Sequence, residues 1–213
     1  SQSTEGWFFH TPGLKIVYPS SPREAKGLLL AAFEDPNPVL FFEHKALYRS
    51  IRQDVPTNYY TLPLGKASLI NEGNDVSVIT YGAGVHWALD TLKELKHISV
   101  DLIDLRSLAP LDTDAIYNSV NKTGKVMILQ EDSMFGGIAS DIAAMIMENC
   151  FEKLDAPVCS GYQHNDSFPG SHPLAAGPLG YNGSKAGMEL IQKADVVLAL
   201  GTRLNPFSTL PVS

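Results

Sequence analysis

Short apolar runs alternate with longer segments whose apolar residues recur every three or four positions. No other feature of the 213-residue sequence constrains its fold as strongly. The runs at residues 76–81, 100–105 and 126–129 have the length of strands. Between and after them lie segments with one apolar helical face, the first made by Val85, Ala88, Leu89, Leu92 and Leu95 and the longest by Ile138, Ile142, Met145, Ile146 and Cys150. Strands that alternate with helices across short loops predict an α/β fold with a mainly parallel sheet and helices on both faces.

The same alternation occurs once before this series. Residues 15–18 predict a strand ended by Pro19, and residues 39–42 predict a second, buried strand. Between them, Ser20 or Ser21 can cap a helix that has Pro22 in its first turn. The sequence therefore predicts a β-α-β unit ahead of the main sheet.

Four segments follow from these patterns. We expect a partial β-α-β unit at residues 1–48, a linker with at most a short strand at 49–73, and a larger α/β domain at 74–158. The fourth segment, residues 159–213, begins with a long Gly/Pro-rich loop. It continues with a helix over residues 184–193 and an apolar run at 196–200, which predict an α-β unit able to extend the same sheet.

Charge and cysteine content exclude several classes. A net charge of −7 with no basic cluster argues against nucleic-acid binding. No apolar run reaches the roughly 18 residues that span a bilayer, and no signal peptide opens the sequence. The two cysteines, Cys150 and Cys159, are too few for a disulfide framework or a zinc site, which favours a cytoplasmic location.

The first three quarters of the chain closely resemble the β subunit of branched-chain 2-oxo acid and pyruvate dehydrogenases. The resemblance rests on SQSTEGWFFHTPGLKIVYPSSPREAKGLLLAAFEDPNPVLFFEHKALYR at the start, DLIDLRSLAPLD at 101–112, SVNKTGKVMILQED at 119–132 and FGGIASDIAAMIMENCFEKLDAPV at 135–158. It implies the end of a thiamine diphosphate pyrimidine domain, followed by the carboxy-terminal domain that these enzymes share with transketolases.

The resemblance also implies that this chain binds no cofactor by itself. The family uses thiamine diphosphate and magnesium, and its active-site His stands immediately before the motif that begins here at Ser1. Its activating Glu lies further upstream, and its magnesium-binding Gly-Asp-Gly belongs to the partner α subunit. We therefore expect no catalytic, cofactor-binding or metal-binding residue in this chain.

The tail resembles a different family. Residues 161–211 read GYQHNDSFPGSHPLAAGPLGYNGSKAGMELIQKADVVLALGTRLNPFSTLP, which is similar to the central domain of sulfoacetaldehyde acetyltransferase, another thiamine diphosphate enzyme. The two resemblances meet at residues 156–158, where both families enter a strand after a helix. The chain is therefore interpreted as a non-catalytic chimera, with a deliberate fusion favoured over a natural recombinant or an assembly error in the sequence.

Two alternatives stay open. The chain could act as a β-subunit portion of a branched-chain 2-oxo acid dehydrogenase that needs an α subunit and the missing segments. The tail could instead complete a phosphate or nucleotide pocket around Arg203, which follows a strand in Gly201-Thr202-Arg203 and suits phosphate as a bidentate donor. A homodimer is also expected as readily as a monomer, because a truncated sheet exposes unpaired edges.

Two glycine motifs are interpreted as structural. Gly82-Ala83-Gly84 lies at a strand-to-helix turn, but Trp87 occupies the place of the third glycine of a dinucleotide fingerprint, so a plain β-α turn is favoured. Gly136-Gly137 precedes a helix whose free N–H groups could hold an anion, and a tight turn is again favoured.

Three histidines are in positions that could belong to a site. His164 and His172 share a loop with Asp166, but their spacing matches no rigid metal-ligand pair, so a solvated loop is favoured. Glu43-His44 ends a strand, where sites in α/β folds usually lie, but the resemblance implies a mainly structural segment.

Overall fold

The computed structural model describes residues 3–133, 136–154, 158–161, 171, 173–179 and 184–193. The chain divides into two compact units, Ser1–Leu154 and Asp155–Ser213, which are described separately. No helix in the described part of the chain is long and apolar enough to cross a membrane.

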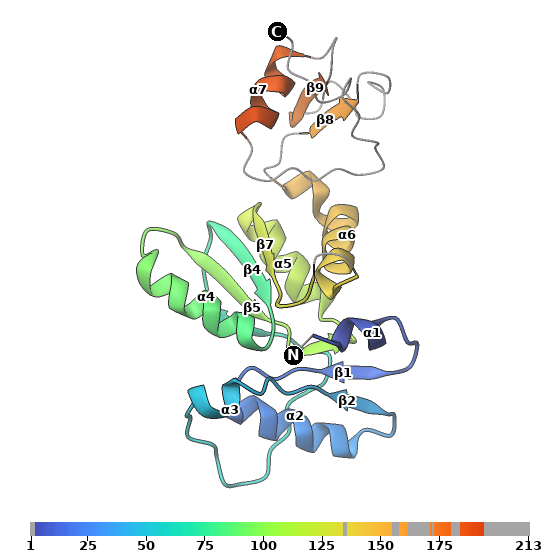
Figure 1. Cartoon of the computed structure of the whole chain (residues 1–213), viewed down its shortest axis with the longest axis vertical. Coiled ribbons are helices and arrows are strands. Elements are labelled where there is room, and N and C mark those ends of the chain that lie inside the picture. The colour runs from blue at the N-terminus through green and yellow to red at the C-terminus, as the bar shows by residue number, and fades with distance from the viewer. Residues whose placement is uncertain are drawn as a thin grey trace. The chain divides into compact units, whose positions relative to one another are not determined.

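A β-α-β unit lies near the beginning of the first compact unit, as predicted (Figure 1). Strand β1 (Lys15–Val17) pairs in parallel with β2 (Val39–Phe41). Helix α2 (Pro22–Glu34) connects them, with Pro22 at its first position and the Ser21 side chain accepting a hydrogen bond from the backbone N–H of Glu24. A short helix, α1 (Glu5–Phe9), precedes this unit, and another, α3 (Leu47–Ser50), follows it.

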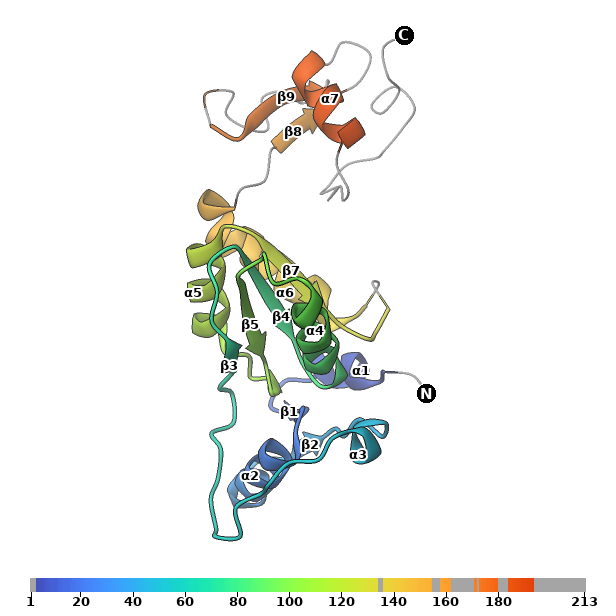
Figure 2. The same cartoon turned by 90° about the vertical axis from the view of Figure 1, so that its left-hand side faces the viewer.

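The main sheet has four strands in the order β3-β5-β4-β7. Its parallel strands β4 (Val76–Thr80), β5 (Val100–Asp104) and β7 (Val126–Leu129) lie where the apolar runs predict them. Helix α4 (Ala83–Glu94) covers one face, and α5 (Thr113–Thr123) and α6 (Ile138–Cys150) cover the other (Figure 2). The predicted fold class is therefore confirmed.

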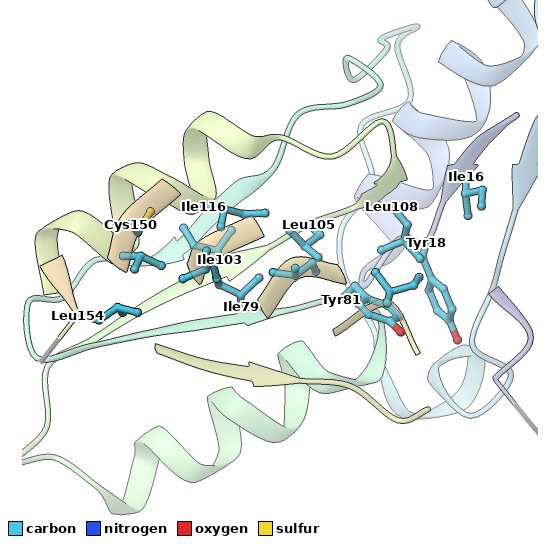
Figure 3. Close-up of a cluster of buried hydrophobic side chains, with 14 residues drawn as sticks. Ile16, Tyr18, Ile79, Tyr81, Ile103, Leu105, Leu108, Ile116, Cys150 and Leu154 are labelled. Atoms are coloured by element: carbon cyan, nitrogen blue, oxygen red, sulfur yellow. The ribbon is translucent and has the colours of Figure 1, made fainter. Parts of the chain in front are cut away.

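Alternate residues of each strand fill two apolar clusters. Ile79 and Ile103 face α5 and α6 in the larger cluster, and Val78 and Leu102 pack in the smaller one with Ala88 of α4. The larger cluster also contains Ile16 and Tyr18 from the β1 region and Leu108 (Figure 3). One continuous core therefore joins the β-α-β unit to the main sheet.

Two strands run antiparallel to their neighbours within the expected, mainly parallel arrangement. β3 (Ser68–Asn71), in the predicted linker, runs antiparallel to β5, and β6 (Ser107–Ala109) runs antiparallel to β1. Three or four residues are too few for a sequence period to be recognised. The predicted linker also packs against α2, where the backbone N–H of Leu62 donates to the Gly27 carbonyl at 3.1 Å. The predicted domain boundaries themselves remain predictions.

The second compact unit contains β8 (Val158–Gly161), β9 (Ala175–Leu179) and α7 (Lys185–Lys193). Helix α7 confirms the prediction for residues 184–193, but β9 lies where only a Gly/Pro-rich loop was expected. The strands β8 and β9 pair in parallel as a separate two-stranded sheet, so they do not extend the main one. The strand predicted at residues 196–200 lies outside the described residues.

Candidate functional site at the carboxyl ends of the strands

Ionisable and aromatic side chains gather where four strands of the first compact unit end. Tyr18 follows β1, His44 lies beyond β2, Tyr81 follows β4 and Glu131 lies beyond β7. Helix α1 adds Glu5 from the beginning of the chain. The carboxyl ends of strands are the usual location of sites in α/β folds, so this cluster is the strongest candidate in the described structure.

Tyr81 and Glu5 form the buried part of this cluster. The Tyr81 hydroxyl donates to Glu5 Oε1 at 2.9 Å, and only 1% of Glu5 is exposed. Burial raises the pKa of the Glu5 carboxyl, and the nearby Asp132 and Glu131 carboxylates add to this rise. Burial and then Glu5 likewise raise the pKa of Tyr81. The Tyr81 phenol therefore stays protonated and acts as a hydrogen-bond donor.

Tyr18 lies beside Tyr81, with ring centroids 5.3 Å apart (Figure 3). Its ring also stacks on that of Phe42, with centroids 5.9 Å apart. Burial first, and then Glu5 and Glu131, raise the pKa of Tyr18 to about 12. The two phenols thus form a neutral layer beside the acidic side chains.

His44 and Glu131 form the more accessible part of the cluster. His44 Nε2 lies 2.8 Å from Glu131 Oε2, and His44 Nδ1 is buried without a hydrogen-bond partner in the described structure. A carboxylate beside imidazole fixes the ring and supports proton transfer. Glu43, the other half of the predicted pair, accepts a hydrogen bond from the Tyr48 hydroxyl at 2.6 Å.

A groove of about 730 Å³ opens beside His44. Its lining is mainly apolar and comes from α3 and α4, including Leu47, Ile51, Ala83, His86 and Trp87. His86 Nε2 donates to the Ser20 carbonyl at 2.7 Å. Of the two imidazoles that line the groove, His86 therefore has a structural role.

The glycines of the Gly82-Ala83-Gly84 turn have a packing role. Gly82 has φ of +55°, and a Cβ there would come within 2.6 Å of the Tyr18 ring. A Cβ on Gly84 would lie 2.0 Å from Thr80 Oγ1. Trp87, at the place of the third fingerprint glycine, is 44% exposed on α4. This geometry fits the predicted β-α turn.

The turn at Gly136-Gly137 is closed by a side chain. Gln130 Oε1 accepts the backbone N–H of Ala139 at 2.9 Å, at the beginning of α6. Gln130 Nε2 donates to the Ser133 carbonyl at 2.8 Å. The Gln130 side chain thus occupies the end of the helix that could otherwise have held an anion.

The remaining predicted candidates lie outside the described residues. These are His164, Asp166, His172, Gly201, Thr202 and Arg203. Glu5, Tyr18, Tyr81 and Glu131 were missed by sequence reasoning, because their proximity arises only from tertiary folding. The positions of the last three near the ends of strands were the one available signal.

Three family models match the chain. Residues 65–171 match the C-terminal domain of transketolase, residues 1–50 match the transketolase pyrimidine-binding domain, and residues 134–212 match the central domain of thiamine pyrophosphate enzymes. The first match covers half of the chain and includes the entire four-stranded sheet.

The chain belongs to the transketolase C-terminal domain family.

Relatives of this family member are β subunits of multi-subunit enzymes. The 2-oxoisovalerate dehydrogenase subunit beta of Bacillus subtilis is 52% identical over 160 residues, which cover 74% of this chain and 49% of the relative. The pyruvate dehydrogenase E1 component subunit beta of the same organism is 46% identical over 171 residues, which cover 79% of this chain and 53% of the relative. The acetoin:2,6-dichlorophenolindophenol oxidoreductase subunit beta of Bacillus subtilis is 48% identical over 160 residues, which cover 74% of this chain and 46% of the relative. The chain therefore spans about half the length of these relatives.

A solved structure supports the fold. A split gene transketolase, described as an inactive beta4 tetramer, aligns with a TM-score of 0.57 at 24% identity. The alignment covers 67% of this chain and 47% of that one. This transketolase-family likeness concerns the fold alone.

The acidic side chains of the candidate cluster do not suit a diphosphate. They contain no group of three His, Cys, Asp or Glu side chains placed to hold a metal ion. Glu131 and Asp132 at the strand ends would repel a diphosphate, and the buried Glu5 is closed off beneath Tyr81. The diphosphate group of thiamine diphosphate therefore does not fit beside these acids.

Proposed function

We propose that the chain is a β-subunit segment of a thiamine diphosphate-dependent 2-oxo acid dehydrogenase and acts by assembling with an α subunit. The observation that carries this proposal is the 52% identity over 160 residues to a 2-oxoisovalerate dehydrogenase β subunit. The matched region extends through the β-α-β unit and the whole main sheet. As the resemblance to the family implies, the diphosphate and its metal would be bound by the partner α subunit.

Branched-chain 2-oxo acids are the substrate class that the proposal favours. The β subunit for 2-oxoisovalerate is 52% identical to this chain, and those for pyruvate and acetoin are 46% and 48% identical. The differences are small, and each of the three relatives is matched over only about half of its length. Identity over this part of the relatives is therefore only weak support for one substrate over another.

Co-expression with an affinity-tagged α subunit of 2-oxoisovalerate dehydrogenase tests the proposal. The full chain should be retained with the α subunit, and full-length β subunit should displace it. An unrelated tagged protein serves as the matched control. Failure of the chain to co-purify, while full-length β subunit does so under the same conditions, would contradict the proposal.

We further propose that the chain is composite, with residues 159–213 derived from the central domain of a second thiamine diphosphate family. The match of residues 134–212 to that central domain and the separate compact unit Asp155–Ser213 support this origin. The pattern from His172-Pro173 to Gly201-Thr202-Arg203 favours sulfoacetaldehyde acetyltransferase as the source. A deliberate fusion is the origin that we propose for the join. A phosphate or nucleotide pocket around Arg203 is a separate alternative, which a flat titration with ADP, flavin and phosphate would remove.

Calorimetry of the full chain tests the composite organisation. Ile142 of α6 is 1% exposed, so Ile142→Ala should remove about 2–5 kcal/mol from the stability of the first unit. We expect two thermal transitions, of which only one shifts in the variant. Glu148→Ala, on the exposed side of the same helix, is the control. One cooperative transition that shifts as a whole would contradict independent units.

A further inference from the structure

A buried polar cluster lies where the β-α-β unit meets the main sheet. It consists of Ser20 after β1, Glu24 of α2, Asp104 at the end of β5 and Arg106 two residues later. Asp104 is 0% exposed and Ser20 3% exposed, and the Glu24 and Arg106 side chains are 12% and 11% exposed. Ionisable groups buried to this extent require a complete set of partners.

Two short contacts of the Ser20 hydroxyl determine how many protons the cluster must hold. Ser20 Oγ lies 2.6 Å from Asp104 Oδ2 and 2.8 Å from Glu24 Oε2. Two hydrogen bonds need two protons, but the hydroxyl supplies only one. If both acids were ionised, one of these short contacts would place a lone pair against a lone pair. One of the two carboxyl groups must therefore carry a proton.

The other contacts place this proton on Asp104. Glu24 Oε1 faces the Arg106 guanidinium at 3.9 Å, and Glu24 Oε2 also accepts from the Ser21 hydroxyl at 3.3 Å. Asp104 Oδ1 accepts the backbone N–H of Arg106 at 3.1 Å, which leaves Oδ2 free to donate to Ser20. Burial first, and then Glu24, raise the pKa of Asp104 well above its ordinary range.

Charge balance agrees with this assignment. The Arg106 guanidinium is fixed by the Lys66 carbonyl at 2.9 Å and the Ala67 carbonyl at 2.9 Å. One guanidinium and one Glu24 carboxylate sum to zero if Asp104 is neutral, whereas an ionised Asp104 would leave one uncompensated buried charge. From α4, His86 donates to the Ser20 carbonyl rather than to a carboxyl group.

We propose that Asp104 is a protonated carboxylic acid in the folded chain. Because of this proton, the stability that the Ser20–Glu24–Asp104–Arg106 cluster contributes to the fold depends on pH. The cluster joins the β1–α2 unit to β5, which are far apart in sequence and share one apolar core. Loss of the proton would place two carboxylates on one hydroxyl and weaken this junction. The proposal does not depend on the proposed function.

The sign of the pH effect follows from linkage. Because the folded chain holds a proton that the unfolded chain releases near pH 4, this stabilisation is complete below about pH 4. It is lost as the pH rises through the pKa of folded Asp104. Between those limits the unfolding equilibrium constant should rise by about tenfold for each pH unit.

Asp104→Asn is the matched isosteric test in the full chain. The introduced amide keeps an acceptor for the Arg106 N–H and gains an N–H donor toward Ser20, so the neutral arrangement is reproduced without a titratable proton. Urea unfolding of both proteins from pH 4 to 9 should show the wild type losing stability relative to the variant as the pH rises. A ratio of unfolding constants that stays flat, or changes in the opposite direction, would overturn the proposal.

Infrared spectroscopy of the wild type provides a second test that does not require Asp104→Asn to fold. At pH 7 the folded chain should show the carbonyl stretch of a protonated carboxylic acid. Glu5 is another buried acid with a raised pKa, so Glu5→Gln identifies its contribution. If Glu5→Gln removes every carboxylic-acid band at pH 7, Asp104 is ionised and the proposal fails.

Discussion

Asp101 and Asp104 lie in the same buried strand, yet their carboxyl groups are stabilised in opposite charge states. Burial alone would raise the pKa of Asp101, but Lys122, Ser119 and the Gly73 N–H lower it below its ordinary value. The Lys122 amine lies 2.6 Å from Asp101 Oδ1. Asp104 has no such cation in direct contact within the described structure, and its pKa is raised. Sequence shows two acids in an apolar run but cannot distinguish these two environments.

Replacing Lys122 with Met should destabilise the first unit at pH 7 by about 1–3 kcal/mol, because a buried carboxylate loses its charged partner. The folded pKa of Asp101 is lowered, so its stabilising contribution is present above about pH 4 and is lost as the pH falls. The difference between variant and wild type should therefore shrink in acid. Urea unfolding at pH 7 and pH 3 measures this difference in unfolding free energy. Lys125 is exposed, so Lys125→Met serves as the control. An equal difference at both pH values would contradict this account.

At the scale of elements, the ends of α5 were predictable from local chemistry. An acid or hydroxyl at residues 112–113 favours a cap and Gly124 favours an end, and the helix spans Thr113–Thr123 with Gly124 in the left-handed region at φ of 68°. β6 was not predictable, because its three residues pair with β1 only through tertiary folding. The candidate site was missed for the same reason, since Glu5 and Tyr81 are 76 residues apart in sequence.

Asp112 does more than cap α5. Its carboxylate accepts the backbone N–H of Ala115 at 3.3 Å and that of Ala67 at 3.1 Å, and Lys66 lies 3.3 Å away. Asp112→Ala should therefore lower the free energy of unfolding by about 1–2 kcal/mol, as for a strong helix cap. Asp114→Ala removes an exposed acid from the same turn and should change it by much less. Equal effects of the two substitutions in denaturant titrations would refute a specific capping role.

At the scale of the whole molecule, one chain joins segments related to three domains of thiamine diphosphate enzymes. The α/β class, the β-α-β unit and the resemblance to dehydrogenase β subunits could all be predicted from sequence. These features depend on repeated apolar patterns and long matched segments. The pairing of β8 with β9 could not be predicted from sequence, because the many Gly and Pro residues in 161–180 favour a loop over the strand at Ala175–Leu179.

Isothermal titration of the purified α subunit of 2-oxoisovalerate dehydrogenase into the full chain tests whether this chain assembles as a β subunit does. We expect saturable binding, because the chain folds as a transketolase C-terminal domain and the proposed function assigns this domain to a β subunit. Full-length β subunit provides the reference for stoichiometry. No heat with this chain, under conditions in which the full-length β subunit binds, would contradict assembly with an α subunit.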